Sequence, residues 1–225
     1  MNRGIQCLAI LKHSLRLERA VPQGVLSSFL FGLTVLILFS FAIGEVNDEL
    51  KMQILLSQVF LCSFLVLQMV HQRILFSEQE DRAMDILVVS PLSYSAIYLA
   101  KVIFACLISG IIIFPFIGFM QVLHAVDLWR LPLLATVCLV LVALSSLGVL
   151  LTQMTEKASG RDLLYPLLYF PLSVPVLLAG VQASFCLWEI QARDDFTLWL
   201  GLLLVFCIIY LSLGVLLFEE LLGLD

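Results

Sequence analysis

Six long runs of apolar residues alternate with short polar stretches along the chain. They cover approximately residues 25–43, 52–70, 96–119, 131–151, 163–183 and 198–218. A helix needs about 20 apolar residues to cross the hydrocarbon core of a bilayer. A membrane-spanning strand would instead show about 10 residues of alternating polarity, and these runs do not alternate. The pattern predicts an all-α integral membrane protein with six transmembrane helices, organised as a single domain over residues 1–225.

Residues 1–20 differ from the six runs because charged and apolar positions are mixed within them. Apolar side chains recur at Ile5, Leu8, Leu11 and Leu15, the spacing of one face of a helix. A cleavable signal peptide would place one basic patch before an uninterrupted apolar core. We therefore expect an N-terminal amphipathic helix that lies in the membrane interface. A basic leader that only sets the orientation of the first span is the alternative.

Composition and charge support a membrane protein and predict its orientation. The chain is 62% hydrophobic and 13% charged, whereas a soluble domain has about 45–50% apolar and about 25% charged residues. The N-terminal segment, the 71–95 connection extended to Lys101, and the 152–162 connection hold nine of the 12 lysines and arginines. Because basic residues stay on the cytoplasmic side, these segments and both termini are predicted to be cytoplasmic.

The motifs of several enzyme classes are absent from the sequence. No GxxxxGK[ST] loop is present to cradle ATP phosphates, and neither HExxH nor GxSxG occurs. The six cysteines form no CxxC pair, and no basic cluster suggests nucleic-acid binding. We therefore expect no enzyme activity, no metal site and no cofactor held by this chain alone. His124 beside Trp129 leaves two interpretations open, a haem contact at the outer surface or an interfacial histidine next to an aromatic anchor.

The stretch from Ser77 to Pro91 is the most charged part of the chain between two apolar runs. Ser77 and Glu80 match a capping box at a helix start, and Pro91 disfavours helix at the residue before it. The sequence therefore predicts a short separate helix between the second and third spans. Lys101, just inside the third span, is expected to extend back to the interface. This stretch is interpreted either as a docking element for a soluble partner or as a solvated connection.

Prolines interrupt two of the predicted spans. The third run contains Pro115, and the fifth contains Pro166, Pro171 and Pro175. Pro166 is expected to open its helix, where the missing N–H has no partner to lose. Within a helix, Pro115, Pro171 and Pro175 each remove one backbone hydrogen bond. They mark a candidate hinge or pathway wall, with a static kink as the alternative.

Together these residues resemble the ABC-2 type permeases. The resemblance rests on an acidic D-x-x-x-D/E-x-L-x-x-x-P loop followed by a lysine, which here is Asp81, Asp85, Leu87, Pro91 and Lys101. The chain is more closely similar to the CcmB family, the haem exporter permeases of cytochrome c maturation. That similarity adds a PLxxxxxxxAK run at 91–101 and a PLxxPxLL-like run at 171–178, and it extends over essentially the whole chain. One departure is Arg82, which stands where the family loop usually has glycine.

The resemblance implies an ABC-2 permease-like fold and a permease subunit of an ABC complex required for cytochrome c biogenesis. ATP would bind a separate CcmA-like ATPase, and the complex would export haem or release a haem-loaded CcmE-like chaperone. Further implied partners are a CcmC-like haem-handling protein, membrane lipid and a second copy of the chain. The coupling residues carried over to this sequence are Glu80, Asp81, Arg82, Asp85, Leu87, Pro91 and Lys101.

The resemblance also implies the bacterial inner (cytoplasmic) membrane as the location, in preference to the mitochondrial inner membrane. Two other functions stay open at this point. One is an ABC-2 permease for a lipid, glycan or other substrate. The other is a membrane scaffold that assembles haem-handling partners without transport.

Overall fold

The structure is a computed structural model that describes residues 23–42, 47–80, 94–155, 158, 160–187 and 193–223. Within these ranges the chain forms six helices, each long and apolar enough to cross a membrane. In chain order they are α2 (Gln23–Ala42), α3 (Asp48–Glu80), α5 (Tyr94–His124), α6 (Leu131–Thr155), α7 (Arg161–Phe185) and α8 (Arg193–Gly223). The prediction of an all-α membrane protein with six spans is confirmed. The interfacial helix expected at 1–20 lies outside the described residues.

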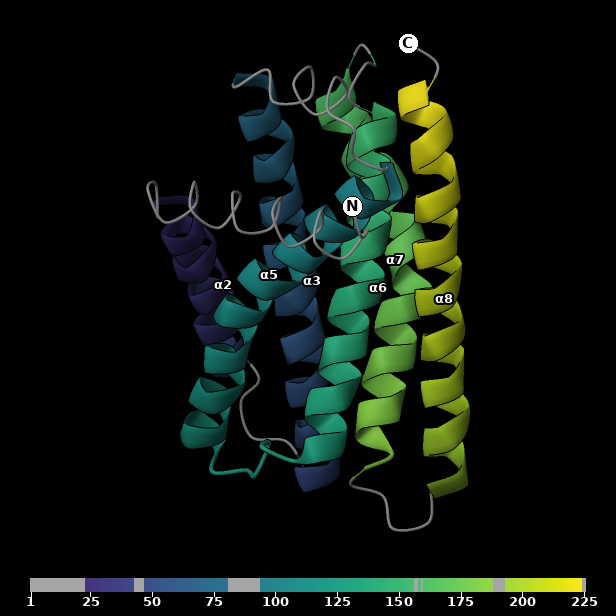
Figure 1. The fold of residues 1–225 in the computed structure, drawn as a ribbon. Coiled ribbons are helices and arrows are strands. Elements are labelled where there is room, and N and C mark those ends of the chain that lie inside the picture. Colours follow the sequence, from purple (N-terminus) through teal and green to yellow (C-terminus); the bar gives the residue numbers. More distant parts are fainter. Residues whose placement is uncertain are drawn as a thin grey trace.

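The helices alternate in direction, so the bundle has two distinct ends (Figure 1). At one end α2, α5 and α7 begin and α3, α6 and α8 finish; we call it the Lys101 end. At the other, the Trp129 end, the directions are reversed. The predicted cytoplasmic connections 71–95 and 152–162 both belong to the Lys101 end. The positions of the helix ends thus agree with the up-and-down order expected from the sequence.

Helix α6 occupies the centre of the bundle and packs against α3, α5, α7 and α8. In its membrane window 72% of the residues are buried, compared with 17% in α2 and 22% in α8. Four small residues of this helix are buried and let its neighbours pack closely: Ala143, Ser145, Ser146 and Gly148. In lipid, small residues let helix backbones approach, and tight packing replaces the hydrophobic effect as the main attraction.

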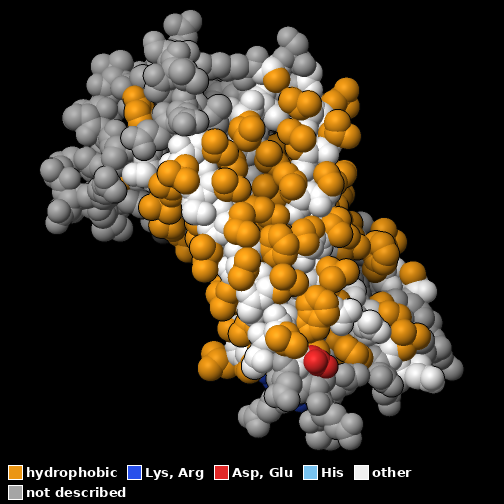
Figure 2. Space-filling model, turned by 90° about the vertical axis from the view of Figure 1, so that its right-hand side faces the viewer, with side chains coloured by type: hydrophobic (Ala, Val, Ile, Leu, Met, Phe, Trp, Pro, Cys, Tyr) orange, Lys and Arg blue, Asp and Glu red, His pale blue; other side chains and the backbone are white. Residues whose placement is uncertain are grey.

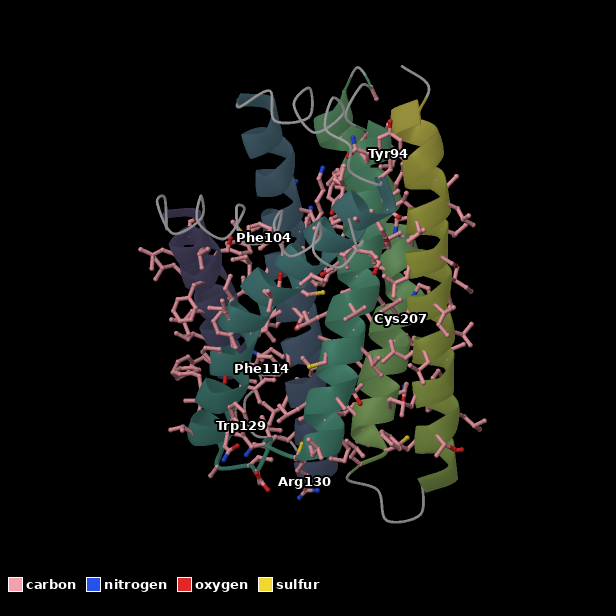
Figure 3. All side chains as sticks on the ribbon, in the orientation of Figure 1. Tyr94, Phe104, Phe114, Trp129, Arg130 and Cys207 are labelled. Carbon is pink, nitrogen blue, oxygen red and sulfur yellow. The ribbon has the colours of Figure 1, made fainter. Side chains whose placement is uncertain are left out.

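The outer surface is apolar over most of its height. Figure 2 shows the face that includes α8, where hydrophobic side chains cover the described area and an acidic side chain appears only near the lower end. Tyr94 lies at the Lys101 end, and Trp129 and Arg130 lie at the opposite end (Figure 3). Tyrosine and tryptophan favour the membrane–water interfaces, so these residues mark the two borders of an apolar band.

Candidate functional site

The segment predicted to contact an ATPase begins at the end of α3. This helix continues from Gln72, where its apolar span finishes, to Glu80, a distance of about 12 Å at roughly 1.5 Å per residue. Glu80 is its last residue, and nothing is described of that side chain. Asp81, Arg82, Asp85, Leu87 and Pro91 lie outside the described residues, so their role as coupling contacts stays a prediction.

The capping box expected at Ser77 and Glu80 is wrong. Both residues lie in the final turns of α3, and no helix begins there. Glutamate and glutamine are good helix formers, so residues 77–80 prolong the preceding span. The separate short helix expected between the second and third spans otherwise lies outside the described residues. A serine followed three residues later by glutamate fits the exposed face of a helix as well as its start.

Lys101 connects α5 to the end of α6. Its Nζ donates a hydrogen bond to Oε1 of Gln153 at 3.4 Å, and only 9% of the residue is exposed. Gln153 lies in the last turn of α6, where unpaired carbonyl groups favour a positive charge. The lysine thus bonds a polar group inside the bundle, and its expected extension to the membrane interface stays a prediction.

His71 is a buried polar group on α3 near the same end. Its side chain has no exposed surface, and its Nδ1 lies 3.0 Å from the hydroxyl oxygen of Tyr165 on α7. The imidazole meets the ring of Tyr169 edge-on at a centroid distance of 5.7 Å. Tyr169 in turn stacks on Tyr165 and on Phe64, with centroids 5.3 and 5.4 Å apart. These aromatic contacts, which we call the His71 cluster, hold α3 against α7.

Gly148 of α6 completes the His71 cluster. A Cβ atom at this position would overlap the His71 imidazole. The absence of a side chain therefore lets the imidazole lie directly on the α6 backbone. Through His71, Tyr165 and Gly148, the helices α3, α7 and α6 meet at one point.

Tyr98 of α5 makes a second junction of this kind. Its side chain is fully buried, and its hydroxyl donates to the backbone oxygens of Ser146 at 3.0 Å and Tyr210 at 3.3 Å. A Cβ atom at Gly214 of α8 would overlap its ring. The hydroxyl of Tyr210 then donates to the backbone oxygen of Leu172 at 2.7 Å. This chain of contacts, the Tyr98 junction, joins α5, α6, α8 and α7.

The proline-containing helices are continuous. α5 stays helical through Pro115, and α7 stays helical through all three of its prolines. The expectation that Pro166 opens its helix is wrong, because α7 begins at Arg161 after Gly160, whose φ of 87° lies in the left-handed region. The Tyr210 hydroxyl donates to the backbone oxygen of Leu172, which lies between Pro171 and Pro175. A hinge at Pro115, Pro171 and Pro175 stays a prediction.

The Trp129 end has a different character. His124 is the last residue of α5, and its Nε2 is hydrogen-bonded to the hydroxyl of Ser40 on α2. The half-exposed Trp129 follows it, with its indole nitrogen 3.7 Å from where a Cβ atom of Gly118 would lie. Within the described ranges no three His, Cys, Asp or Glu side chains gather to hold a metal ion. This geometry fits an interfacial histidine next to an aromatic anchor.

The described part of the Lys101 end is therefore held together by contacts between helices. The His71 cluster, the Tyr98 junction and the Lys101 hydrogen bond all converge on one stretch of α6. Sequence reasoning found Lys101 but missed His71, Tyr98 and Gly148. The available signal was the small residues at positions 145, 146 and 148 together with tyrosines near the ends of neighbouring spans.

Comparison with known proteins adds an independent line of evidence. Residues 5–220 match the model of a family described as CcmB protein. A curated relative, heme exporter protein B of Bradyrhizobium diazoefficiens, is 29% identical over 182 residues, which cover 78% of this chain and 79% of the relative. No solved structure matches the chain.

Proposed function

The chain belongs to the CcmB protein family, and from that membership we propose that it is the membrane permease subunit of a haem-exporting ABC transporter complex. The name of the relative, heme exporter protein B, supports haem as the substrate of the complex. The six apolar helices supply the membrane part of such a complex. Since the sequence has no phosphate-binding loop, the energy source is a separate, CcmA-like ATPase.

The observation that carries the coupling proposal is the length of α3. The helix extends beyond its apolar span to Glu80, so the acidic 81–91 stretch follows directly on a helical extension. A soluble ATPase that docks there would push on the end of α3. His71 anchors the same helix to α6 and α7. We propose Glu80, Asp81, Arg82, Asp85, Leu87 and Pro91 as the contacts, with Lys101 fixing the start of α5 behind them.

The haem step has two forms within this proposal. ATP hydrolysis either drives haem outward or releases a haem-loaded, CcmE-like chaperone from a complex that includes a CcmC-like protein. In both forms the permease chain responds to the ATPase and holds no haem as a resident cofactor. A second copy of the chain supplies the other half of the membrane part. The complex lies in the bacterial inner membrane, with the Lys101 end and both termini facing the cytoplasm, as the distribution of basic residues indicates.

Deletion and complementation test this function. Cells that lack the chain should lose c-type cytochromes, and the wild-type gene should restore them. Restoration should fail when the ATPase partner carries a substitution that blocks hydrolysis, because the permease works only when coupled. Full restoration with the inactive ATPase would indicate a scaffold, and unchanged c-type cytochromes after deletion would indicate a permease for another substrate.

A further inference from the structure

The His71 cluster leaves one nitrogen of its histidine without a hydrogen-bond partner. Nδ1 of His71 is bonded to the Tyr165 hydroxyl, whereas Nε2 is buried and has no partner among the described residues. A neutral imidazole has one donor and one acceptor nitrogen, so the ring needs two partners. An unpaired polar atom inside a membrane bundle is costly, because no bulk water satisfies it. The position that His71 occupies therefore satisfies only one of its two nitrogens.

Two buried hydroxyl groups on the neighbouring helices are unpaired as well. Tyr169 on α7 and Ser145 on α6 have no exposed surface, and neither hydroxyl has a partner among the described residues. The Cys106 thiol of α5 lies near Ser145, but a thiol is a weak partner and this one donates to the backbone oxygen of Leu141. The large majority of buried polar side-chain atoms are hydrogen-bonded, so unpaired atoms on three packed helices need an explanation.

Both unpaired hydroxyl groups lie in the same direction from His71. On α7, Tyr169 is four residues after Tyr165, the present partner of the imidazole. On α6, Ser145 is three residues before Gly148, on which the imidazole lies, and residues three or four apart share one face of a helix. Because α6 and α7 run in opposite directions (Figure 1), both steps lead toward the Trp129 end. The rings of Tyr165 and Tyr169 are 5.3 Å apart, close to the helix pitch of about 5.4 Å.

Small side chains line the way from the present contacts to these hydroxyl groups. On α6, Gly148 has no side chain, and Ser145 is the next residue toward the Trp129 end on that face. Phe64 of α3 stacks on Tyr169, and the residue one turn further along α7 is the buried Ser173. The faces of α6 and α7 that contact α3 thus leave room for a shift of α3 along its axis.

We propose that His71 has a second position, one helical turn closer to the Trp129 end. In this position the Tyr169 hydroxyl donates to Nδ1, and Nε2 donates to the hydroxyl oxygen of Ser145. Helix α3 shifts along α6 and α7 by about 5 Å, a one-turn step of one packed element past another. Both nitrogens are then paired, and the imidazole stays neutral throughout. The present structure shows the first position, with the partners of the second still unpaired.

The direction of this shift matches the direction in which an ATPase would push α3. The acidic stretch follows the end of α3 at the Lys101 end, so a partner that presses there moves the helix toward the Trp129 end. Pressure from the ATPase favours the second position, and its release returns His71 to Tyr165. This link rests on the proposed function, whereas the existence of two positions does not depend on it.

A distance between two spin labels measures the shift. Leu50→Cys at the start of α3 and Leu163→Cys at the start of α7 are exposed and lie at opposite ends of the bundle. The six native cysteines are replaced by alanine, and labelled chains are diluted with unlabelled ones. ATP bound to a hydrolysis-deficient ATPase should lengthen this distance by about 5 Å, one helical turn. The control pair, Leu131→Cys on α6 with Leu163→Cys, should keep its distance.

Tyr165→Phe tests the two positions without the ATPase. It removes the hydrogen bond of the first position and leaves both bonds of the second. In the purified chain alone, the ratio of the longer to the shorter distance should rise about threefold, the effect of a typical hydrogen bond between membrane helices. An unchanged ratio would overturn the second position. A rise in Tyr165→Phe without any response to ATP would keep the second position and contradict the link to the ATPase.

Removal of the unpaired hydroxyl groups separates this role from a purely structural one. Tyr169→Phe and Ser145→Ala break no hydrogen bond of the first position, so the free energy of unfolding should not fall. ATP turnover of the complex should nevertheless fall about threefold in each variant, because the second position loses one bond. Ser184→Ala removes another buried, unpaired hydroxyl near the Trp129 end and should change neither quantity. Normal turnover in Tyr169→Phe and Ser145→Ala would overturn the proposal.

Discussion

The imidazole of His71 lies on the backbone of Gly148, at a distance that leaves no room for a methyl group between α3 and α6. This pair joins the helix that leads to the acidic stretch with the most buried helix of the bundle. Gly148→Ala should therefore lower the free energy of unfolding by about 2 kcal/mol, the cost of overpacking a dense core. Urea or SDS titration of the purified chain in mild detergent measures this change.

A matched glycine provides the control for that substitution. Gly201 of α8 has no atom within 4 Å of an added Cβ, so Gly201→Ala should be neutral or stabilising by roughly 0.5–1 kcal/mol. The double variant His71→Ala with Gly148→Ala should lose less stability than the two single changes added together. Strict additivity would mean that the imidazole is not the group that Gly148 accommodates.

The backbone conformation of Gly160 leads to a second prediction about stability. Its φ of 87° lies in the left-handed region at the turn before α7, where a side chain costs about 1–2 kcal/mol. Gly160→Ala should lower stability by that amount. Gly110→Ala serves as the control, since its added Cβ would meet Phe114 at an ordinary 3.5 Å. Equal effects of the two changes in the same unfolding assay would contradict the turn geometry.

Tyr98 should act as a connector of three helices. Tyr98→Phe keeps the ring but removes the donor to the Ser146 and Tyr210 carbonyl groups. We expect a loss of about 0.6 kcal/mol, up to about 1.7 kcal/mol, the range measured for hydrogen bonds between membrane helices. Tyr94→Phe at the start of the same helix is the control. The unfolding free energies of both variants measure the contribution of each hydroxyl. A loss of stability confined to Tyr94→Phe would contradict the role of Tyr98.

Lys101 should affect coupling more than stability. Lys101→Met preserves much of the side-chain volume but breaks the hydrogen bond to Gln153, which joins the start of α5 to the end of α6. ATP turnover of the reconstituted complex should fall about fivefold, equivalent to a coupling free energy of about 1 kcal/mol. Lys51→Met, near the Trp129 end, should leave turnover unchanged. A similar decrease in both variants would indicate a general effect of removing charge.

The spans were predictable because each depends on local composition. Long runs of apolar residues predicted all six helices, and the ends of α2 and α7 agree with the prediction within two residues. The exception is α3, which continues to Glu80 because good helix formers prolong a helix that already exists. The local capping pattern at Ser77 could not show whether a helix was starting or continuing. Pro166 was misplaced for a similar reason, since the start of α7 depends on the glycine before it.

The contacts at the Lys101 end could not be predicted because they join residues far apart in sequence. His71 belongs to the 71–95 connection that the sequence places on the cytoplasmic side, whereas the structure buries it beside Tyr165 and Gly148. Nothing in the sequence around His71 indicates those partners; they follow from how α3, α6 and α7 pack. Lys101 was identified because its basic charge near a span border stands out locally.

Charge reversal in the acidic stretch tests the coupling role of that stretch most directly. The double variant Glu80→Lys with Asp85→Lys is purified with its ATPase, alongside Asp127→Lys at the Trp129 end as the control, a residue paired with Arg130 at 3.9 Å. We predict that the double variant loses ATPase binding and stimulated turnover, while the control keeps both. Unchanged binding and turnover in the double variant would contradict coupling through this stretch.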